Sequence, residues 1–111
     1  MILQPEIRTE DGKEYYYFRF QVQPIANSIT VYQVSTGLFE NRMVCYFEVR
    51  DTPAAVTDLV SRFAQIYSNV QKTGTGYRFV LNEAIPDKVF EDSIAVFDFA
   101  EDGTIVGIEI V

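Results

Sequence analysis

The sequence contains no histidine and no tryptophan, and its single cysteine is Cys45. Without histidine, the Ser–His and Cys–His pairings of nucleophilic catalysis cannot form, and zinc sites lose their commonest nitrogen ligand. One cysteine allows no intramolecular disulfide, which favours a reducing compartment. Cys45 alternates with Met43 and Phe47 on a predicted inward strand face. We therefore expect a buried and unreactive thiol.

Long apolar runs and basic clusters are also missing. No apolar stretch approaches the about 20 residues that a membrane-spanning helix needs. Residues 1–6 lack the basic start and apolar run of a signal peptide. The nine basic residues are scattered and outnumbered by sixteen acids, which argues against direct binding of nucleic acid or anionic lipid. These absences predict a cytoplasmic protein that binds neither membranes nor nucleic acid.

The composition is that of one folded domain. The 111 residues are 48% hydrophobic and 23% charged, which is enough to bury a core without metals or disulfides. Aromatic residues reach 14%, all of them Tyr and Phe, and this favours β-structure. No linker, repeat or low-complexity tract divides the chain. We expect a single domain over residues 1–111.

Alternation of apolar and polar residues predicts strands before the helix. An edge strand over residues 2–8, an Asp-Gly turn at residues 10–13 and a strand over residues 15–23 come first. Strands over residues 29–34 and 43–50 follow, joined by a turn at residues 35–41. In the last of these strands Val44, Tyr46, Glu48 and Arg50 alternate with the Cys45 face and are expected to point outward.

A helix is predicted over residues 53–69. Thr52 suits the N-cap and Pro53 the first helical position. Apolar residues then recur at helical spacing, and Gly74 and Gly76 stop the helix. A strand over 76–82, a loop over 83–92 and a hairpin of strands 93–99 and 104–111 complete the chain. The predicted core is Tyr16, Phe18, Phe20, Cys45, Phe47, Val56, Leu59, Val60, Phe63, Tyr67 and Phe79.

The predicted fold class is therefore α+β, in the order β-β-β-β-α-β-β-β. One antiparallel sheet of five to seven strands would carry one amphipathic helix packed on one face. Because one helix covers only one face of such a sheet, the other face must meet solvent, curl on itself or meet a partner.

Charge is distributed unevenly along the chain. Residues 82–111 contain eight acids and one basic residue, Lys88, and thus carry the whole net charge of −7. Such an asymmetry favours a surface for a basic partner. The candidate acidic contact residues are Asp87, Glu91, Asp92, Asp98, Glu101 and Asp102.

The tyrosines offer a second candidate surface. Tyr15, Tyr17 and Tyr46 fall on the mixed polar faces of their strands, opposite the Phe-rich faces. If those strands are neighbours, they form a surface rich in Tyr and Arg, which protein interfaces favour. Ordinary cross-strand pairing on a half-exposed sheet explains the same pattern equally well.

No motif indicates a cofactor, a metal or a catalytic site. Asp98, Glu101 and Asp102 could hold calcium or magnesium, but their spacing is not that of an EF-hand, and a solvated Asp-Gly turn is favoured. The glycines of residues 72–76 follow a helix, whereas a phosphate loop places them before one. We expect no cofactor and no enzymatic activity, although carboxylates alone can catalyse hydrolysis.

Residues 96–110, VFDFAEDGTIVGIEI, resemble the final hairpin of the YuzE-like family of small prokaryotic domains of unknown function. That family ends in a similar Asp-Gly-x-(Leu/Val)-x-Gly-(Ile/Phe)-Glu-(Ile/Val) run. The resemblance covers about fifteen of the 111 residues, and the family's upstream Tyr-Asp…Asp…Tyr signature is missing here. It implies a prokaryotic or phage source and no activity.

Two functional hypotheses follow from the sequence. The first is a non-catalytic acidic protein that blocks a basic surface of another protein, as immunity proteins, antitoxins and anti-defence inhibitors do. The second is a self-associating structural module, a homodimer through the open sheet face or an edge strand. Steep salt dependence of binding would favour the first, and loss of an oligomer on changing Tyr17 and Tyr46 would favour the second.

Overall fold

The structure is a computed structural model that describes residues 5–20, 28–40, 43–50, 53–67, 69–74 and 76–111. Three predicted features lie partly or wholly outside the described residues. They are the N-cap Thr52, the end of the strand predicted over residues 15–23 and the start of the strand predicted over residues 2–8.

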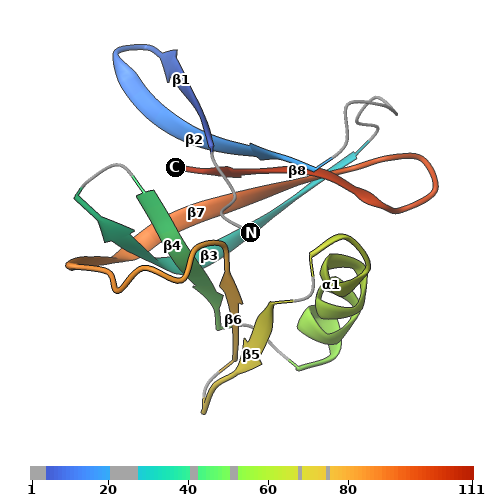
Figure 1. Cartoon of the computed structure of the whole chain (residues 1–111). Coiled ribbons are helices and arrows are strands. Elements are labelled where there is room, and N and C mark those ends of the chain that lie inside the picture. The colour runs from blue at the N-terminus through green and yellow to red at the C-terminus, as the bar shows by residue number, and fades with distance from the viewer. Residues whose placement is uncertain (1–4, 21–27, 41–42, 51–52, 68, 75) are drawn as a thin grey trace.

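The described chain forms one sheet and one helix (Figure 1). The elements are β1 (Glu6–Glu10), β2 (Lys13–Arg19), β3 (Ser28–Phe39), β4 (Met43–Val49), α1 (Pro53–Ile66), β5 (Val70–Lys72), β6 (Tyr77–Val80), β7 (Lys88–Phe99) and β8 (Ile105–Ile110). All strand pairs are antiparallel, in the order β1-β2-β8-β7-β3-β4-β6-β5. The α+β class and the single antiparallel sheet are confirmed.

The strand count was predicted too low, because the sheet has eight strands. The additional strand is β5, which pairs with β6 and has only three residues. So short a strand shows no readable alternation in sequence. The helix ends at Ile66 rather than at Asn69, and the glycine segment after it turns between β5 and β6. In that turn, Thr73 N–H donates to the Gly76 carbonyl at 2.8 Å.

The predicted turn at residues 35–41 and the predicted loop at residues 83–92 are both partly wrong. β3 continues to Phe39 and β7 begins at Lys88, so each strand has twelve residues. These extensions pair with each other, as Thr36 with Phe90 and Leu38 with Lys88. Local turn preference is overridden here by pairing between segments far apart in sequence.

The two long strands divide the sheet into two halves. β8 pairs with the C-terminal part of β7, and β4 pairs with the C-terminal part of β3. Register shifts lie between Val34 and Thr36 and between Gly37 and Leu38, in the part of β3 that pairs with both β7 and β4. β-Bulges at such shifts bend a sheet. Figure 1 shows the result: a strongly bent sheet, with β1 and β2 at one end and β5 and β6 beside α1 at the other.

The core fills the space between the bent sheet and α1. Val56, Leu59 and Phe63 of α1 are buried, as their helical spacing predicted. The other predicted core residues are buried or are half-buried and packed against the core. Two residues of β4 predicted to point outward are buried, for different reasons: Val44 packs in the core, so its face was wrongly predicted, whereas Glu48 lies outside the core cluster and is bound by Arg50 and Arg78. Gly37 pairs with Tyr46 and Leu38 with Val44, so a register shift adds one residue to β4 here and breaks the period-two alternation that the prediction used.

Candidate partner-binding surfaces

The outer face of the sheet, opposite the core, is arranged in rows of directly paired residues. One row runs Val31, Val96, Glu109, Tyr17 and Glu6, across β3, β7, β8, β2 and β1. Period-two alternation thus placed Tyr15 and Tyr17 on the correct face of β2. What it did not predict is the extent to which each side chain is covered.

Tyr17, one of the predicted partner contacts, is buried on this outer face. Only 4% of the residue is exposed. The Arg8 guanidinium lies 3.9 Å from the centroid of its ring, and the Arg19 guanidinium lies 5.2 Å away. Gly107 of β8 leaves the space that the Tyr17 hydroxyl fills, since a Cβ at that glycine would collide with it. The ring is a packed part of the sheet rather than a contact surface.

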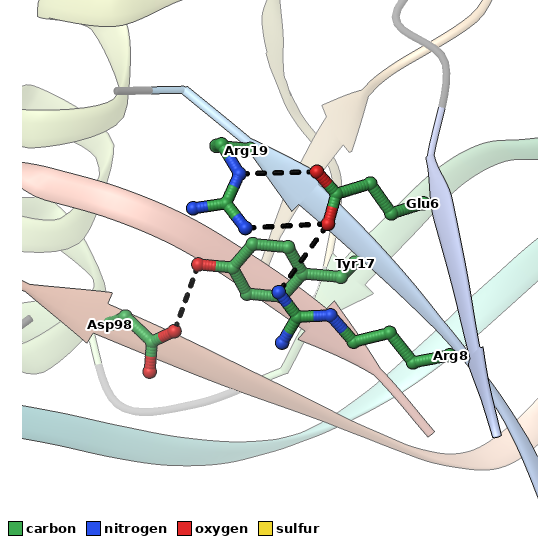
Figure 2. Close-up of polar contacts among 5 residues, drawn as sticks. All are labelled: Glu6, Arg8, Tyr17, Arg19 and Asp98. Atoms are coloured by element: carbon green, nitrogen blue, oxygen red, sulfur yellow. Dashed lines mark hydrogen bonds and ion pairs between the residues drawn. The ribbon is translucent and has the colours of Figure 1, made fainter. Parts of the chain in front are cut away.

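A polar network fixes the Tyr17 side chain (Figure 2). Its hydroxyl donates to Asp98 Oδ2 at 3.1 Å, and Glu6 accepts from Arg19 Nε at 3.1 Å and from Arg8 at 3.4 Å. Burial, followed by the nearby Asp98 carboxylate, raises the pKa of Tyr17. The hydrogen bond from Arg19 is the largest influence that lowers the pKa of Glu6. The phenol therefore stays protonated at neutral pH and donates to Asp98.

Tyr46 lies in a different arrangement on β4. The residue is half-buried, and the Arg78 guanidinium stands 4.0 Å from the centroid of its ring. Next to it, Glu48 is 5% exposed and accepts from Arg50 at 3.2 Å and from Arg78 at 3.3 Å. Two arginines thus compensate one buried carboxylate, as a buried charge requires.

The three predicted tyrosines do not form one surface. Tyr15 and Tyr17 are on β2, whereas Tyr46 is on β4, and β8, β7 and β3 lie between these strands. At about 4.8 Å per strand spacing, four spacings separate β2 from β4 by about 19 Å along the sheet. The assumption that their strands are neighbours was wrong, because the order of strands depends on pairings between residues far apart in sequence.

The predicted acidic residues are also separated. Asp87, Glu91 and Asp92 lie at the start of β7 and are exposed, while Glu101 and Asp102 are exposed in the turn after it. The strand between Asp92 and Phe99 alone spans about 23 Å at 3.3 Å per residue. Residues 82–111 therefore present two acidic groups at opposite ends of β7 rather than one cluster.

Some of these carboxylates have structural contacts. Asp102 accepts from Thr104 N–H at 3.0 Å and from its hydroxyl at 2.7 Å, which lowers the pKa of Asp102. Asp87 accepts from the Glu40 N–H at 3.3 Å. Asp98 is half-buried and holds Tyr17. The carboxylates without such a contact among the described residues are Glu91, Asp92 and Glu101.

Ion pairing leaves the C-terminal acids uncompensated. Within the described residues, ion pairs join Glu6 with Arg8 and Arg19, Glu48 with Arg50 and Arg78, and Asp58 with Arg62. Every acid in these pairs lies before residue 82. All five arginines in these pairs thus contact acids that precede residue 82. Among the described residues, the carboxylates of residues 82–111 have no ion-pair partner.

The start of β7 is an open sheet edge. Residues 88–90 pair with β3 on one side and Glu91 and Asp92 lie in the register shift that follows, whereas β7 contacts β8 only from Ile94 onward. Val89 is 52% and Phe90 48% exposed there, next to Glu91 and Asp92. We call residues 88–92 the β7 edge. The sequence analysis predicted a loop over residues 83–92 and therefore did not identify Val89 and Phe90 as exposed residues of a strand.

A second exposed apolar group lies on the outer face. Ile29 is 63%, Val31 55%, Ile94 40% and Val111 47% exposed. Cross-strand pairing places Ile29 and Val31 of β3 on the same face as Ile94 of β7, and Ile94 exchanges backbone hydrogen bonds with Val111. These four residues are the outer strip. Single exposed apolar residues are ordinary, but a contiguous group of them is typical of contact surfaces.

Cys45 is the one thiol of the chain, and the acidic side chains are its candidate metal ligands. The Cys45 thiol is buried, and burial raises its pKa, so it is a poor nucleophile. The described residues bring together no group of three metal-ligating side chains. No described helix has the length and apolar character needed to cross a bilayer.

Comparisons with family models, curated proteins and solved structures found no match to this chain. The similarity of residues 96–110 to the YuzE-like hairpin therefore stays a resemblance. In the structure this segment forms the end of β7, the turn with Gly103 at a φ of 88°, and β8.

Proposed function

We propose that this protein is a non-catalytic binding protein that covers a basic surface of another protein, in the manner of an immunity protein, antitoxin or anti-defence inhibitor. The observation that carries this proposal is the ion-pair distribution: the arginines of the described residues are paired upstream, and the carboxylates of residues 82–111 are not. Uncompensated carboxylates attract a basic surface over a distance of about one Debye length.

The β7 edge supplies the contact chemistry for such a partner. Phe90 and Val89 offer exposed apolar area, and Glu91 and Asp92 stand beside them. An apolar centre with a polar rim is the usual composition of a protein interface. The open backbone of residues 88–92 also allows a partner strand to add to the sheet. We also propose that the protein acts in the cytoplasm, because its single cysteine, Cys45, is free and buried.

The test is a binding measurement on charge variants. The partner is first captured from the native host with the wild-type protein and identified by mass spectrometry. The variant Glu91→Gln/Asp92→Asn is then compared with a matched control, Glu10→Gln/Asp11→Asn, which removes the same charge at exposed positions before residue 82. We expect the first variant to lower the association rate by roughly three- to tenfold and the control to change it less.

Salt dependence decides the outcome. If carboxylates steer association, the wild-type rate falls steeply with ionic strength and the β7-edge variant shows a shallower slope. A captured partner that binds both variants equally well, with an association rate independent of salt, would remove the basis of this proposal.

We propose self-association as a second candidate function, because of the outer strip. A stable dimer buries about 800 Å² per partner, which is about one eighth of the 6788 Å² accessible surface. The outer face of β3, β7 and β8 offers apolar area for this purpose. Sedimentation analysis of the wild type and of Val31→Arg tests it: a dimer that becomes a monomer in the variant supports the candidate, and a monomeric wild type at high concentration excludes it.

A further inference from the structure

The strand β8 is shorter than the two strands that flank it. β8 pairs with β2 only as far as Tyr16 and with β7 only as far as Ile94, although β2 begins at Lys13 and β7 at Lys88. Figure 1 shows β2 and β7 continuing on either side of the C-terminal end of β8 and diverging there. Since two strand spacings separate β2 from β7, about 10 Å at the end of β8, the space between them has the width of one further strand.

A cavity with a volume of 200 Å³ lies in this space and is lined from β2, β3, β7 and β8. This volume is below the range of small-molecule sites, about 300–1,000 Å³, and suits a side chain rather than a whole ligand. The cavity combines apolar walls with two exposed carboxylates. The apolar lining includes Tyr16, Leu38, Phe90 and Ile110, and the carboxylates are those of Glu14 and Asp92. We call the space between β2 and β7 that contains this cavity the β8 slot.

The backbone on both sides of the β8 slot is placed to pair with a further strand. Phe20 N–H donates to the Val106 carbonyl at 2.9 Å, so the even-numbered residues of β2 direct their backbone groups toward β8. Glu14 has the same direction by alternation, but the pairing of β2 with β8 ends at residue 16. On the other side, no described strand pairs with the β7 edge opposite β3. A strand that continues the line of β8 therefore faces Glu14 on one side and β7 on the other.

The charge around the β8 slot is negative. Glu14 and Asp92 line its cavity from opposite sides, and neither belongs to an ion pair among the described residues. Lys13 and Lys88 lie on the same two strands, but neither lines the cavity. A segment that enters the slot thus meets apolar walls between two carboxylates, which favours an apolar side chain accompanied by a basic one.

We propose that the β8 slot binds an extended segment of the basic partner, which adds to the sheet as a strand in line with β8. Residues two apart share one face of a strand, so the segment places an apolar side chain in the cavity and a Lys or Arg beside Glu14 or Asp92. Backbone pairing supplies affinity and the alternate side chains supply specificity. A second copy of this chain is disfavoured, because each copy carries −7. The inference rests on the proposed function, since it states which part of the basic partner is bound.

The test titrates the capped peptide Ac-Thr-Lys-Thr-Val-Thr-Lys-Thr-NH₂ into isotope-labelled protein and follows the backbone amide signals by NMR. We expect saturable shifts at Glu14 and in the β7 edge. A peptide with Glu in place of both Lys should bind at least tenfold more weakly because of charge. A peptide N-methylated at Val and at both Lys keeps its side chains but loses three backbone donors, and it should also bind at least tenfold more weakly. If these signals do not move, or if either altered peptide binds as tightly as the first, the proposal is wrong.

Variants separate the slot from the net charge of the protein. Glu14→Gln/Asp92→Asn should weaken binding of the basic peptide at least fivefold. The matched control Glu83→Gln/Glu101→Gln removes the same charge at exposed positions that do not line the cavity, and it should have little effect. All four positions are exposed, so both variants should fold, which circular dichroism checks. Equal weakening by the two variants would show that net charge alone attracts the peptide and would overturn the assignment of the slot.

Competition with the captured partner distinguishes this inference from the proposed function. Displacement of the partner by excess basic peptide supports the slot as its binding site. A partner that associates in a salt-dependent manner but is not displaced leaves the proposed function in place and overturns the added strand. Salt-independent association overturns the proposed function itself. If the signals of Glu14 and the β7 edge instead change with protein concentration before any peptide is added, a second copy occupies the slot and the proposal is wrong.

Discussion

The substitution Phe63→Ala tests whether α1 holds the bent sheet together. Phe63 has no exposed area. The centroid of its ring lies 5.7 Å from that of Phe20, 5.8 Å from that of Tyr67 and 4.9 Å from that of Phe79. Phe20 directly follows β2 and Phe79 belongs to β6, so this one side chain joins the two halves of the sheet. Its removal opens a cavity at a place where neither half can easily collapse.

The expected loss is large. Phe→Ala in a core costs about 3–5 kcal/mol, and edge-to-face ring pairs add about 0.5–1.5 kcal/mol each, so the upper end of the range is expected. A domain of this size has a total stability of about 6–17 kcal/mol. A loss of about 4 kcal/mol should lower Tm by about 15–25 °C.

The assay is urea unfolding followed by far-UV circular dichroism and by tyrosine fluorescence. Gln65→Ala is the matched control, because it truncates an exposed side chain two residues further along the same helix and should shift the free energy of unfolding by less than about 0.5 kcal/mol. A Phe63→Ala protein that loses less than about 1 kcal/mol would refute the packing of α1 between the two halves.

Three further substitutions test individual contacts. Gly107→Ala should destabilise by about 1–3 kcal/mol, because the new Cβ collides with the Tyr17 hydroxyl, and adding Tyr17→Phe should recover part of the loss in a denaturation cycle. Tyr17→Phe alone should cost about 0.5–1.5 kcal/mol through the lost bond to Asp98, an expectation that an unchanged urea midpoint would contradict. The pKa of Asp102 is lowered in the folded protein, so its carboxylate stabilises the fold above the unfolded pKa of about 3.9, and this stabilisation is lost as pH falls through the folded pKa. Asp102→Ala should therefore reduce the loss of unfolding free energy with falling pH in the acid range.

The helix and much of the core could be predicted because their signals are local. Val56, Leu59 and Phe63 recur at helical spacing, and all three are buried. Alternation in β2 likewise gave the correct faces for Tyr17 and Phe18. Both patterns depend only on the geometry of one element, which the neighbouring residues determine.

The missed elements depend on distant pairing. Residues 88–92 contain Lys, Glu and Asp, which are poor strand formers, and they belong to a strand because β3 pairs with residues 88–90 and again from Ser93 onward. The burial of Tyr17 has a similar origin, since Arg8 of β1 covers its ring and Gly107 of β8 leaves room for its hydroxyl. No periodicity within β2 contains that information.

The staggered strands also bear on the choice between the two proposed functions. In the described chain, residues 28–33 of β3 pair only with β7, and residues 88–90 of β7 pair only with β3, so the stagger adds two open edges to the outer edges of β1 and β5. Glu91 and Asp92 stand on the β7 edge, where a second copy would bring the same negative charge and be repelled. A basic partner would instead be attracted to it. Ile29 and Val31 on the other long strand carry no charge, so self-association should use the outer strip while a basic partner uses the β7 edge. The two functions therefore predict separable variants: Val31→Arg should affect only self-association, and Glu91→Gln/Asp92→Asn only binding of the basic partner.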